Sequence, residues 1–361
     1  MNNSHVVVIA EAGVNHDGSL QTALDLVDAA AEVGADVVKF QTFKAAELAS
    51  TLAPKPAYQI RRTGNEESQL EMLRRLELSV EAHRAIIARC AEKRIGFLSS
   101  VFDHNSLTLL ADEFRLQDLK FGSGELTNAP LLLAAARTGC RLILSTGMGT
   151  LAEVEEALGV IAFGFTAGIN ATPRSTAFAA TLTQPAAWDV LRSRVILLHC
   201  TTDYPAAPMD VNLRAMKTMR NAFGLRVGYS DHTEGTAISI AAVAQGAVMI
   251  EKHLTLDRTS PGPDHAASLE PSEFSDLVRA IRDVQAAMGN GIKKPSEAES
   301  ANRVVTRKSL VAACAVSKGQ KFSAENVAVK RPGSGRTPTQ YWSTIGMPAD
   351  RDYAAGEPLD P

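Results

Sequence analysis

Eight short apolar runs alternate with amphipathic stretches over residues 6–288, and this alternation constrains the fold more than any other feature. Near-continuous apolar runs are typical of parallel strands buried on both faces, and the amphipathic stretches are long enough to be crossover helices. Eight strands with eight crossovers predict a (β/α)8 TIM barrel. The predicted strands are Val6–Ala10, Asp36–Phe40, Gly96–Ser99, Leu119–Phe121, Arg141–Leu144, Val195–Leu198, Arg226–Tyr229 and Val248–Glu251.

A doubly wound parallel sheet is the competing architecture. Such sheets usually have fewer strands and a glycine-rich turn after the first strand. No G-x-G-x-x-G pattern follows Val6–Ala10, so the barrel is favoured.

Composition narrows the class of protein. The 37 basic and 40 acidic side chains leave a net charge of -3, which argues against a nucleic-acid-binding surface. No apolar run reaches the ~20 residues of a membrane helix, and Met1–His5 lacks the basic segment of a secretory signal. The four scattered cysteines form no C-x-x-C pair, which argues against a disulfide framework or a zinc knot. We therefore expect a cytoplasmic enzyme with no nucleic-acid or membrane partner.

Two segments depart from the barrel pattern. Gly289–Ser296 has the composition of a linker, and short strands are expected at Ser309–Ala313 and Val327–Lys330 beyond it. The expected division is a barrel over 1–288, a linker over 289–302 and a small β-rich domain over 303–361. The long Phe163–Arg194 connection is expected to be a surface insertion rather than a lid, because it carries little charge.

Every predicted strand is followed by polar or ionisable residues, and barrel active sites form at these carboxyl ends. Lys39 and Lys120, with the hydroxyls of Ser99, Ser100 and Ser123, could hold a phosphate. His232 and His253 follow neighbouring strands and could share one divalent metal. Glu11 and Glu125 could move protons or orient a water molecule. Each residue taken alone could equally be a cap or a buried polar group, but eight such strand ends together predict an active site.

Longer motifs resemble the sialic acid synthase family, which makes nonulosonic acids. They are Ile9–His16, Val38–Phe43, Gly122–Glu125, Ser145–Met148, Leu198–Pro205, Gly228–Thr233, Glu251–His253 and Pro261–His265. In the tail, Val329–Gly335 resembles the SAF (antifreeze-like) domain of the same enzymes.

The resemblance implies a reaction in which phosphoenolpyruvate condenses with the open-chain aldehyde of an N-acyl hexosamine, releasing phosphate and a nine-carbon 2-keto acid. It implies Mn2+ or Mg2+ bound by His232 and His253, and proton transfers by Glu11 and Glu125. It places phosphoenolpyruvate among Lys39, Ser100, Lys120, Ser123, Thr202 and Tyr204. It assigns the sugar to Gln41, Asp264 and Arg331, and Arg331 would come from the other subunit of a domain-swapped homodimer.

The sequence departs from the family pattern at two places. Ser100-Val101 stands where some members have Thr-Pro, and Phe163–Arg194 is longer than the usual connection.

The resemblance leaves the sugar open. We expect N-acetylmannosamine and hence N-acetylneuraminate, with a 2,4-diacetamido-trideoxyhexose and a legionaminate or pseudaminate product as the alternative. The segments Ala53–Gln59 and Gly64–Gln69 occur in similar form across these subgroups and do not decide between them. A metal-dependent barrel aldolase or hydrolase and a non-enzymatic carbohydrate- or ice-binding protein are the more distant alternatives.

Overall fold

The computed structural model describes residues 5–56, 59–60 and 67–361. Residues 1–4, where we looked for a secretory signal, and parts of the segments 53–59 and 64–69 lie outside the described residues. The chain divides into two compact units, Met1–Asn290 and Gly291–Pro361.

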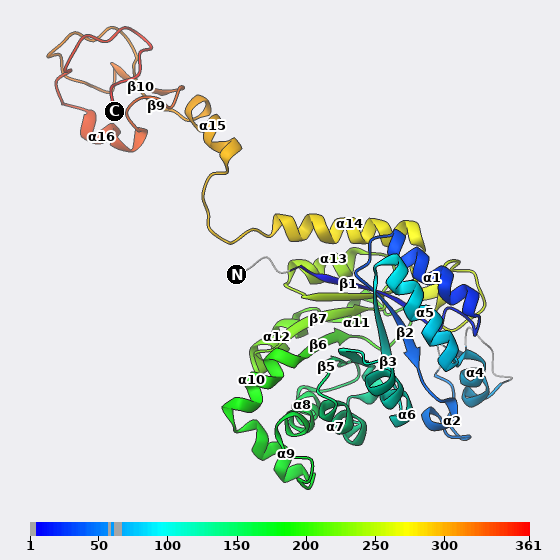
Figure 1. The fold of residues 1–361 in the computed structure, drawn as a ribbon. Coiled ribbons are helices and arrows are strands. Elements are labelled where there is room, and N and C mark those ends of the chain that lie inside the picture. The colour runs from blue at the N-terminus through cyan, green and yellow to red at the C-terminus, as the bar shows by residue number, and fades with distance from the viewer. Residues whose placement is uncertain (1–4, 57–58, 61–66) are drawn as a thin grey trace. The chain divides into compact units, whose positions relative to one another are not determined.

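The first unit is a closed barrel of eight parallel strands in sequential order, which confirms the predicted TIM barrel (Figure 1). The barrel closes where β1 pairs with β8 in the register Val7↔Met249. Its strands are β1 (Val7–Gly13), β2 (Val37–Thr42), β3 (Gly96–Val101), β4 (Asp118–Phe121), β5 (Arg141–Ser145), β6 (Val195–Cys200), β7 (Arg226–Asp231) and β8 (Met249–His253).

Most strands continue past the apolar runs that predicted them. β1 reaches Gly13, β2 reaches Thr42 and β8 reaches His253, so polar residues expected just after the strands lie within them. The reason is that ladder hydrogen bonds are made by the backbone and do not require an apolar side chain. The polar residues are therefore held on rigid elements rather than on loops.

The barrel interior has an apolar layer with a polar layer above it. Ile9, Leu98, Ile143, Leu198 and Met249 form the apolar layer. Because side chains alternate between the two faces of a strand, the residue two positions further along also points inward. Glu11, Ser100, Ser145 and Glu251 stand at these positions, so the alternation itself places them at the carboxyl end of the barrel.

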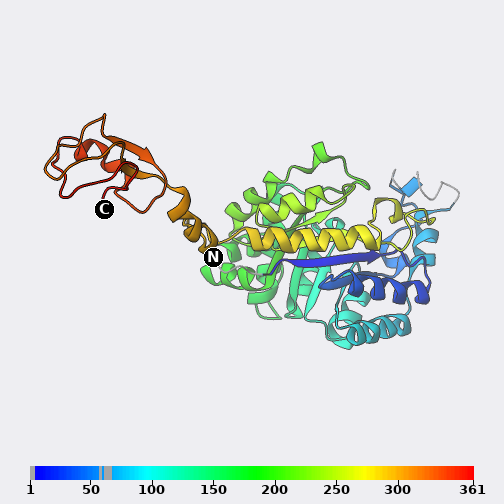
Figure 2. The same ribbon diagram turned by 90° about the horizontal axis from the view of Figure 1, so that it is seen from above.

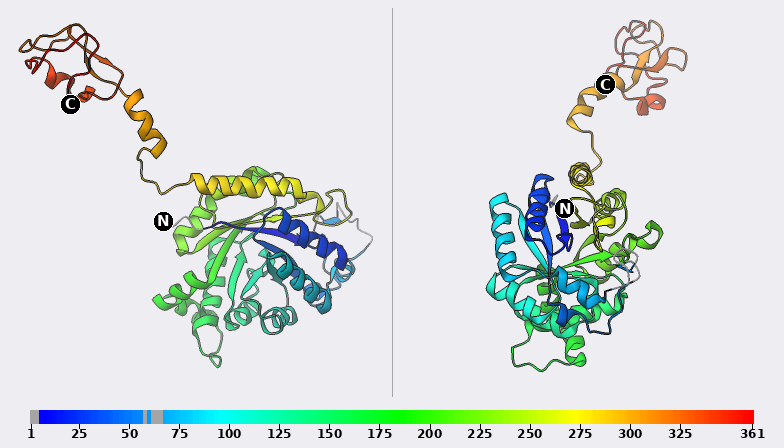
Figure 3. Two further views of the ribbon diagram at one scale, coloured as in Figure 1. Left: turned by 45° about the horizontal axis from the view of Figure 1, so that its top comes forward. Right: turned by 90° about the vertical axis from the view of Figure 1, so that its right-hand side faces the viewer.

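Helices surround the barrel (Figure 3). α14 (Pro271–Ala287) runs beside β1 (Figure 2). The Gln285 side chain accepts a hydrogen bond from the Val6 amide, and Arg282 donates one to the Val6 carbonyl. In the described part of this unit the helices are α1 (Leu20–Glu32), α2 (Ala45–Leu48), α4 (Gln69–Leu76), α5 (Val80–Lys93), α6 (His104–Thr108), α7 (Ala129–Arg137), α8 (Leu151–Thr166), α9 (Ser175–Leu182), α10 (Pro185–Arg194), α11 (Pro208–Val211), α12 (Arg214–Phe223), α13 (Ala237–Ala244) and α14 (Pro271–Ala287), with the π-helix η1 (Leu109–Glu113) and the short 3-10 helices η2 (Ser123–Glu125) and η3 (His265–Ala267).

The long Phe163–Arg194 connection is helical. It contains the end of α8, then α9 and α10, and the rings of Phe163 and Phe178 meet edge to face with centroids 5.2 Å apart. The connection leads from a helix into the amino end of β6, which is the barrel end opposite the predicted site. This course favours the surface insertion over a lid.

The second unit carries its own small core of residues such as Leu310, Phe322, Tyr353 and Leu359. It begins with α15 (Glu297–Thr306), which starts within the stretch expected to be a linker, because Ser296 and Glu299 form a capping box. Strands β9 (Ser309–Ala312) and β10 (Val327–Lys330) pair antiparallel, and η4 (Pro338–Gln340) and α16 (Tyr341–Thr344) follow.

Within the described part of the chain, no helix is both long and apolar enough to cross a membrane.

Candidate active site

A cavity of about 360 Å3 opens at the carboxyl ends of the barrel strands. Most of the residues predicted from the sequence line it together, namely Glu11, Lys39, Gln41, Ser100, Lys120, Ser123, Glu125, Thr202, Tyr204, His232, His253 and Asp264. Arg331 belongs to the second unit, where it is exposed, and is not part of this cavity. Ser99, the other phosphate candidate, points away from the cavity and contacts the Thr42 hydroxyl at 2.6 Å, because alternation turns it outward.

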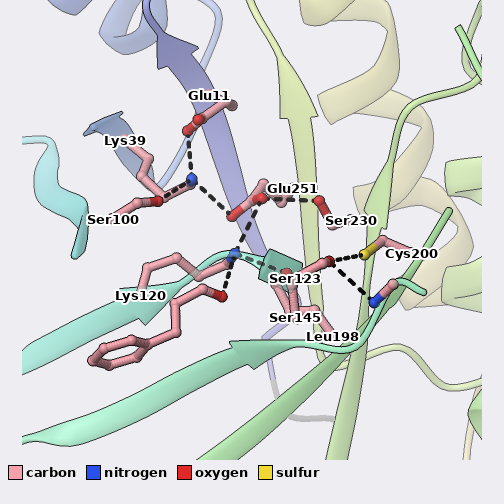
Figure 4. A network of polar contacts seen from close by, with 12 residues as sticks. Glu11, Lys39, Ser100, Lys120, Ser123, Ser145, Leu198, Cys200, Ser230 and Glu251 are labelled. Atoms are coloured by element: carbon pink, nitrogen blue, oxygen red, sulfur yellow. Dashed lines mark hydrogen bonds and ion pairs between the residues drawn. The ribbon is translucent and has the colours of Figure 1, made fainter. Parts of the chain in front are cut away.

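Two lysines and two glutamates form a buried network at the floor of the cavity (Figure 4). Lys39 Nζ lies 2.8 Å from Glu11 Oε2, 3.6 Å from Glu251 Oε2 and 3.0 Å from Ser100 Oγ. Lys120 Nζ lies 3.6 Å from Glu251 Oε1. Lys120 also donates to Ser145 Oγ at 2.8 Å, and Ser230 donates to Glu251 at 2.8 Å. The four charges cancel, so the barrel holds them without a net buried charge.

Burial acts differently on each of these groups. Burial raises the pKa of the Glu11 carboxyl, and Lys39 offsets this only in part. Burial also favours the neutral form of Glu251, but Lys120 and Lys39 outweigh it and hold the pKa of Glu251 below its usual range. Burial lowers the pKa of Lys120, whereas Glu11 and Glu251 overcome burial at Lys39 and raise its pKa. Glu11 is therefore the member of the network placed to exchange a proton.

A corner of small polar groups adjoins the lysines. Ser123 Oγ accepts a hydrogen bond from the Gly147 amide at 3.0 Å and lies 3.0 Å from Cys200 Sγ. A Cβ at Gly147 would lie 2.4 Å from Thr202 Oγ1 and 2.8 Å from Ser123 Oγ, so only glycine fits there. Thr202 Oγ1 is buried without a hydrogen-bond partner among the described residues. This corner can present hydroxyls to an anion held by Lys120.

The rings of His232 and His253 lie side by side at the cavity, with centroids 5.6 Å apart and an angle of 60° between their planes. The Nδ1 of His232 lies 2.6 Å from the Thr201 carbonyl, so this nitrogen carries the proton and donates it. Nε2 lies 3.4 Å from Ser230 Oγ, and it keeps its electron pair because the Ser230 hydroxyl donates to Glu251. The Nδ1 of His253 is buried and has no partner among the described residues. Burial lowers the pKa of His232 to about 4 and that of His253 well below its usual range, so both rings are neutral.

Neutral imidazoles with free electron pairs are suitable ligands for a divalent metal. Among the described residues, no group of three or more His, Cys, Asp and Glu side chains is placed to hold a metal ion. A metal bound by the two histidines would therefore complete its coordination with substrate or water.

The other polar residues of the cavity surround this centre. Asn128 donates to Glu125 at 2.7 Å, and burial raises the pKa of Glu125. Burial also raises the pKa of Asp264 to about 6. Gln41 donates to Glu11 at 3.4 Å, and the Tyr204 ring lies 4.2 Å from the His232 ring, measured between centroids.

Glu251 lines the cavity and belongs to the buried network, but sequence reasoning gave it no role, although it belongs to a quoted motif. Two signals could have found it. Glu251 lies two residues before His253 on β8, so both side chains point into the barrel. In addition, two lysines pointing into a barrel need two carboxylates, and Glu11 supplies only one.

Comparisons with known proteins show what the chain is similar to. The NeuB family model matches residues 26–293, and the SAF domain model matches residues 307–361. The chain is 46% identical to the N,N'-diacetyllegionaminic acid synthase of Campylobacter jejuni over 97% of this chain and 98% of that protein. It is 41% identical to the enzyme of the same name from Legionella pneumophila, over 98% and 92% of the two chains. Among solved structures, the N-acetylneuraminic acid synthetase of Leptospira borgpetersenii matches 83% of this chain and 90% of its own with a TM-score of 0.66 and 32% identity.

Proposed function

Because the chain belongs to the NeuB family, we propose that it is an N,N'-diacetyllegionaminic acid synthase. Enzymes of this family condense phosphoenolpyruvate with a sugar, and this chain is a phosphoenolpyruvate-dependent transferase that forms a carbon–carbon bond. The proposed substrate rests on one observation. The chain is 46% and 41% identical, over nearly its whole length, to two N,N'-diacetyllegionaminic acid synthases.

This proposal replaces our first expectation from the sequence, which was N-acetylneuraminate. The N-acetylneuraminic acid synthetase of known structure is 32% identical to this chain, clearly less than the two legionaminic acid synthases. The alternative that we kept open, a 2,4-diacetamido-trideoxyhexose as the sugar, is therefore better supported.

Phosphoenolpyruvate would bind at the floor of the cavity. Its phosphate and carboxylate are anions, and Lys39 and Lys120 are the cations there, with hydroxyls of Ser100, Ser123 and Thr202 nearby. Carbon 3 of phosphoenolpyruvate attacks the sugar aldehyde, water then adds at carbon 2, and phosphate leaves with cleavage of its C–O bond. Glu11 and Glu125 would serve the proton transfers during water addition, because burial raises the pKa of both carboxyls.

His232 and His253 would hold a divalent metal, Mn2+ or Mg2+, which as a Lewis acid polarises a carbonyl oxygen. We expect His232→Asn and His253→Asn each to lose Mn2+ binding measured by titration calorimetry. His16→Asn, which replaces another buried histidine outside the cavity, is the control. Unchanged Mn2+ affinity in both cavity variants would exclude the two histidines as ligands.

The SAF domain would contribute a residue to the active site of a neighbouring subunit. Arg331 is exposed in the SAF domain, and the family resemblance assigns it to the sugar of the other subunit in a domain-swapped homodimer. This assignment is part of the proposal.

The substrate is tested by measuring phosphate release from phosphoenolpyruvate with different sugars. We expect the highest kcat/KM with a 2,4-diacetamido-2,4,6-trideoxyhexose and a much lower value with N-acetylmannosamine. A stereoisomer of the diacetamido sugar tests for a pseudaminate-type enzyme. A preference for N-acetylmannosamine would overturn the proposal.

A further inference from the structure

One side of the cavity is apolar, although the substrates described so far are anionic or rich in hydroxyls. We call this side the apolar wall, and it comprises Val14, Leu48, Met72, Leu73, Leu76 and Phe102. Val14 follows β1, Leu48 lies in α2, three residues lie in α4, and Phe102 follows β3. Val14 and Leu73 are 5% and 9% exposed, so these side chains reach the cavity surface with little contact to bulk water.

The apolar wall belongs to a small hydrophobic cluster that is separate from the main core of the barrel. That cluster also contains Phe43, Ala45 and Leu70, which do not line the cavity. The rings of Phe43 and Phe102 meet edge to face with centroids 6.0 Å apart and connect the two parts. The cluster thus has an inner part that stabilises α2 and α4 and an outer part that faces the cavity.

Neither phosphoenolpyruvate nor a metal accounts for an apolar wall. The anion and the two histidines take up the polar side, where the lysines, glutamates and hydroxyls lie. The remaining ligand is the sugar, so the wall faces part of the sugar. Hydroxyl groups pressed against such a surface lose water without gaining a partner, which is unfavourable, whereas methyl groups gain by burial.

We infer that the apolar wall is the subsite that selects a deoxygenated, acetamido-bearing sugar over a hydroxylated one. The inference rests on the proposed function and deepens it. A 2,4-diacetamido-2,4,6-trideoxyhexose has a methyl group at carbon 6 and an acetamido methyl at carbon 4. N-acetylmannosamine has hydroxyl groups at both positions. The wall buries the two methyl groups and offers the two hydroxyls no hydrogen-bond partner.

Amide side chains at the edge of the wall fit the polar part of an acetamido group. Gln69 lies three and four residues before Met72 and Leu73 on α4, so it shares their face of the helix, and it lines the cavity. Gln59 lines the cavity as well. A glutamine amide can donate to the acetamido carbonyl and accept from its N–H.

The test compares kcat/KM for the two sugars in variants that make the wall polar. Leu73→Gln places an amide on the wall, and Val14→Thr exchanges a methyl for a hydroxyl of nearly the same size. Leu70→Gln is the matched control, since Leu70 lies on the same helix and is 7% exposed but does not line the cavity. The ratio of the two kcat/KM values within one preparation does not depend on the fraction of folded enzyme. A loss of stability therefore cannot imitate the result.

We expect Leu73→Gln to lower the preference for the diacetamido sugar about tenfold or more, and Val14→Thr to lower it by a smaller factor. The KM for phosphoenolpyruvate should stay unchanged in both, and Leu70→Gln should keep the wild-type ratio. If Leu73→Gln is inactive with both sugars, the ratio in Val14→Thr decides. Wild-type ratios in the wall variants would overturn the inference while leaving the proposed function intact. A wild-type enzyme that prefers N-acetylmannosamine would overturn the proposed function itself.

Discussion

At the scale of single residues, the chain buries charged groups at the carboxyl end of the barrel, above the apolar layer of its interior. Glu11, Lys39, Lys120 and Glu251 are each less than 5% exposed, and their charges alternate across the barrel mouth. Unpaired, any one of them would be expensive to bury, but the network supplies each with an opposite charge. An anionic substrate that binds the lysines competes with the glutamates, and a Glu11 carboxyl with a raised pKa can take up a proton at that moment.

The first prediction concerns Lys120. Lys120→Met keeps the length of the side chain and removes its charge, and a hydrogen bond to a charged group contributes about 1.5–3 kcal/mol. We expect the KM for phosphoenolpyruvate to rise about tenfold or more, and the KM for the sugar to change less. Lys252→Met is the matched control, because Lys252 is also buried but does not line the cavity. An unchanged KM for phosphoenolpyruvate in Lys120→Met would mean that this lysine serves the fold alone.

The second prediction concerns acid stability and His16. Burial lowers the pKa of this ring from 6.5 to about 4, and its Nδ1 accepts a hydrogen bond from the Gly18 amide at 3.0 Å. Between pH 6.5 and 4 the unfolded chain binds the proton and the folded chain does not. Stability from this group is therefore lost as the pH falls, by about 1.4 kcal/mol per pH unit.

The measurement is the free energy of unfolding by urea, taken between pH 7.5 and 4.5. His16→Gln should be less stable than wild type at pH 7.5, and the difference should shrink as the pH falls. His104→Gln, at an exposed position, is the control for loss of an imidazole. Parallel curves for wild type and His16→Gln would show that the buried ring does not govern acid sensitivity.

At the scale of elements, the carboxyl ends of β7 and β8 carry the two candidate metal ligands and a buried ion pair beside them. Asp231 and Lys252 pair in register, are each fully buried, and have charged atoms 3.1 Å apart. They point outward from the barrel where His253 points inward, because side chains alternate along a strand. The ion pair therefore joins the two strand ends that hold His232 and His253.

The third prediction is that removing the charge of Asp231 lowers the free energy of unfolding more than removing that of Lys252. Asp231 accepts hydrogen bonds from Ser239 Oγ, the Thr233 amide and hydroxyl, and Tyr229 Oη, so its carboxylate keeps partners without Lys252. Without the Asp231 charge, the Lys252 ammonium would keep the Thr233 carbonyl as its hydrogen-bond partner among the described residues. Asp231→Asn should lower the free energy of unfolding by about 3–5 kcal/mol, and Lys252→Met by less. Equal losses in urea unfolding would contradict this explanation.

At the scale of the whole molecule, two units with separate cores share one chain. In the second unit, Arg351 contacts Asp360 and Glu357 and lies over the Tyr353 ring at 4.2 Å from its centroid, which ties the chain end to the core. This unit has few large apolar residues, so its stability depends on such contacts more than that of the barrel does. Its Arg331 is exposed, and it is the residue through which we propose that this unit contacts the sugar.

The fourth prediction is that Arg331 acts on the neighbouring subunit. Arg331→Ala and His232→Ala should each be nearly inactive as homodimers. After subunit exchange, a mixed dimer combines one intact barrel with one intact tail and should recover part of the wild-type phosphate release. Exchange is verified by native mass spectrometry of chains with different tags. No recovery despite verified exchange would assign each tail to its own barrel.

Local sequence was enough to predict the barrel and much of its mouth. Strands that are buried on both faces must be apolar, and this pattern predicted the barrel. Side chains alternate along a strand, so Lys39 and Gln41 on β2 and His253 on β8 point inward whichever strands lie beside them. The tertiary structure alone decided which charges meet. Glu11 lies level with Lys39 and with His253 only because the barrel closes in this register. Closure also gave Glu251 two lysines as partners, and packing of α4 beside the mouth placed the apolar wall in the cavity. These features depend on contacts between residues far apart in the chain, and no local pattern encodes them.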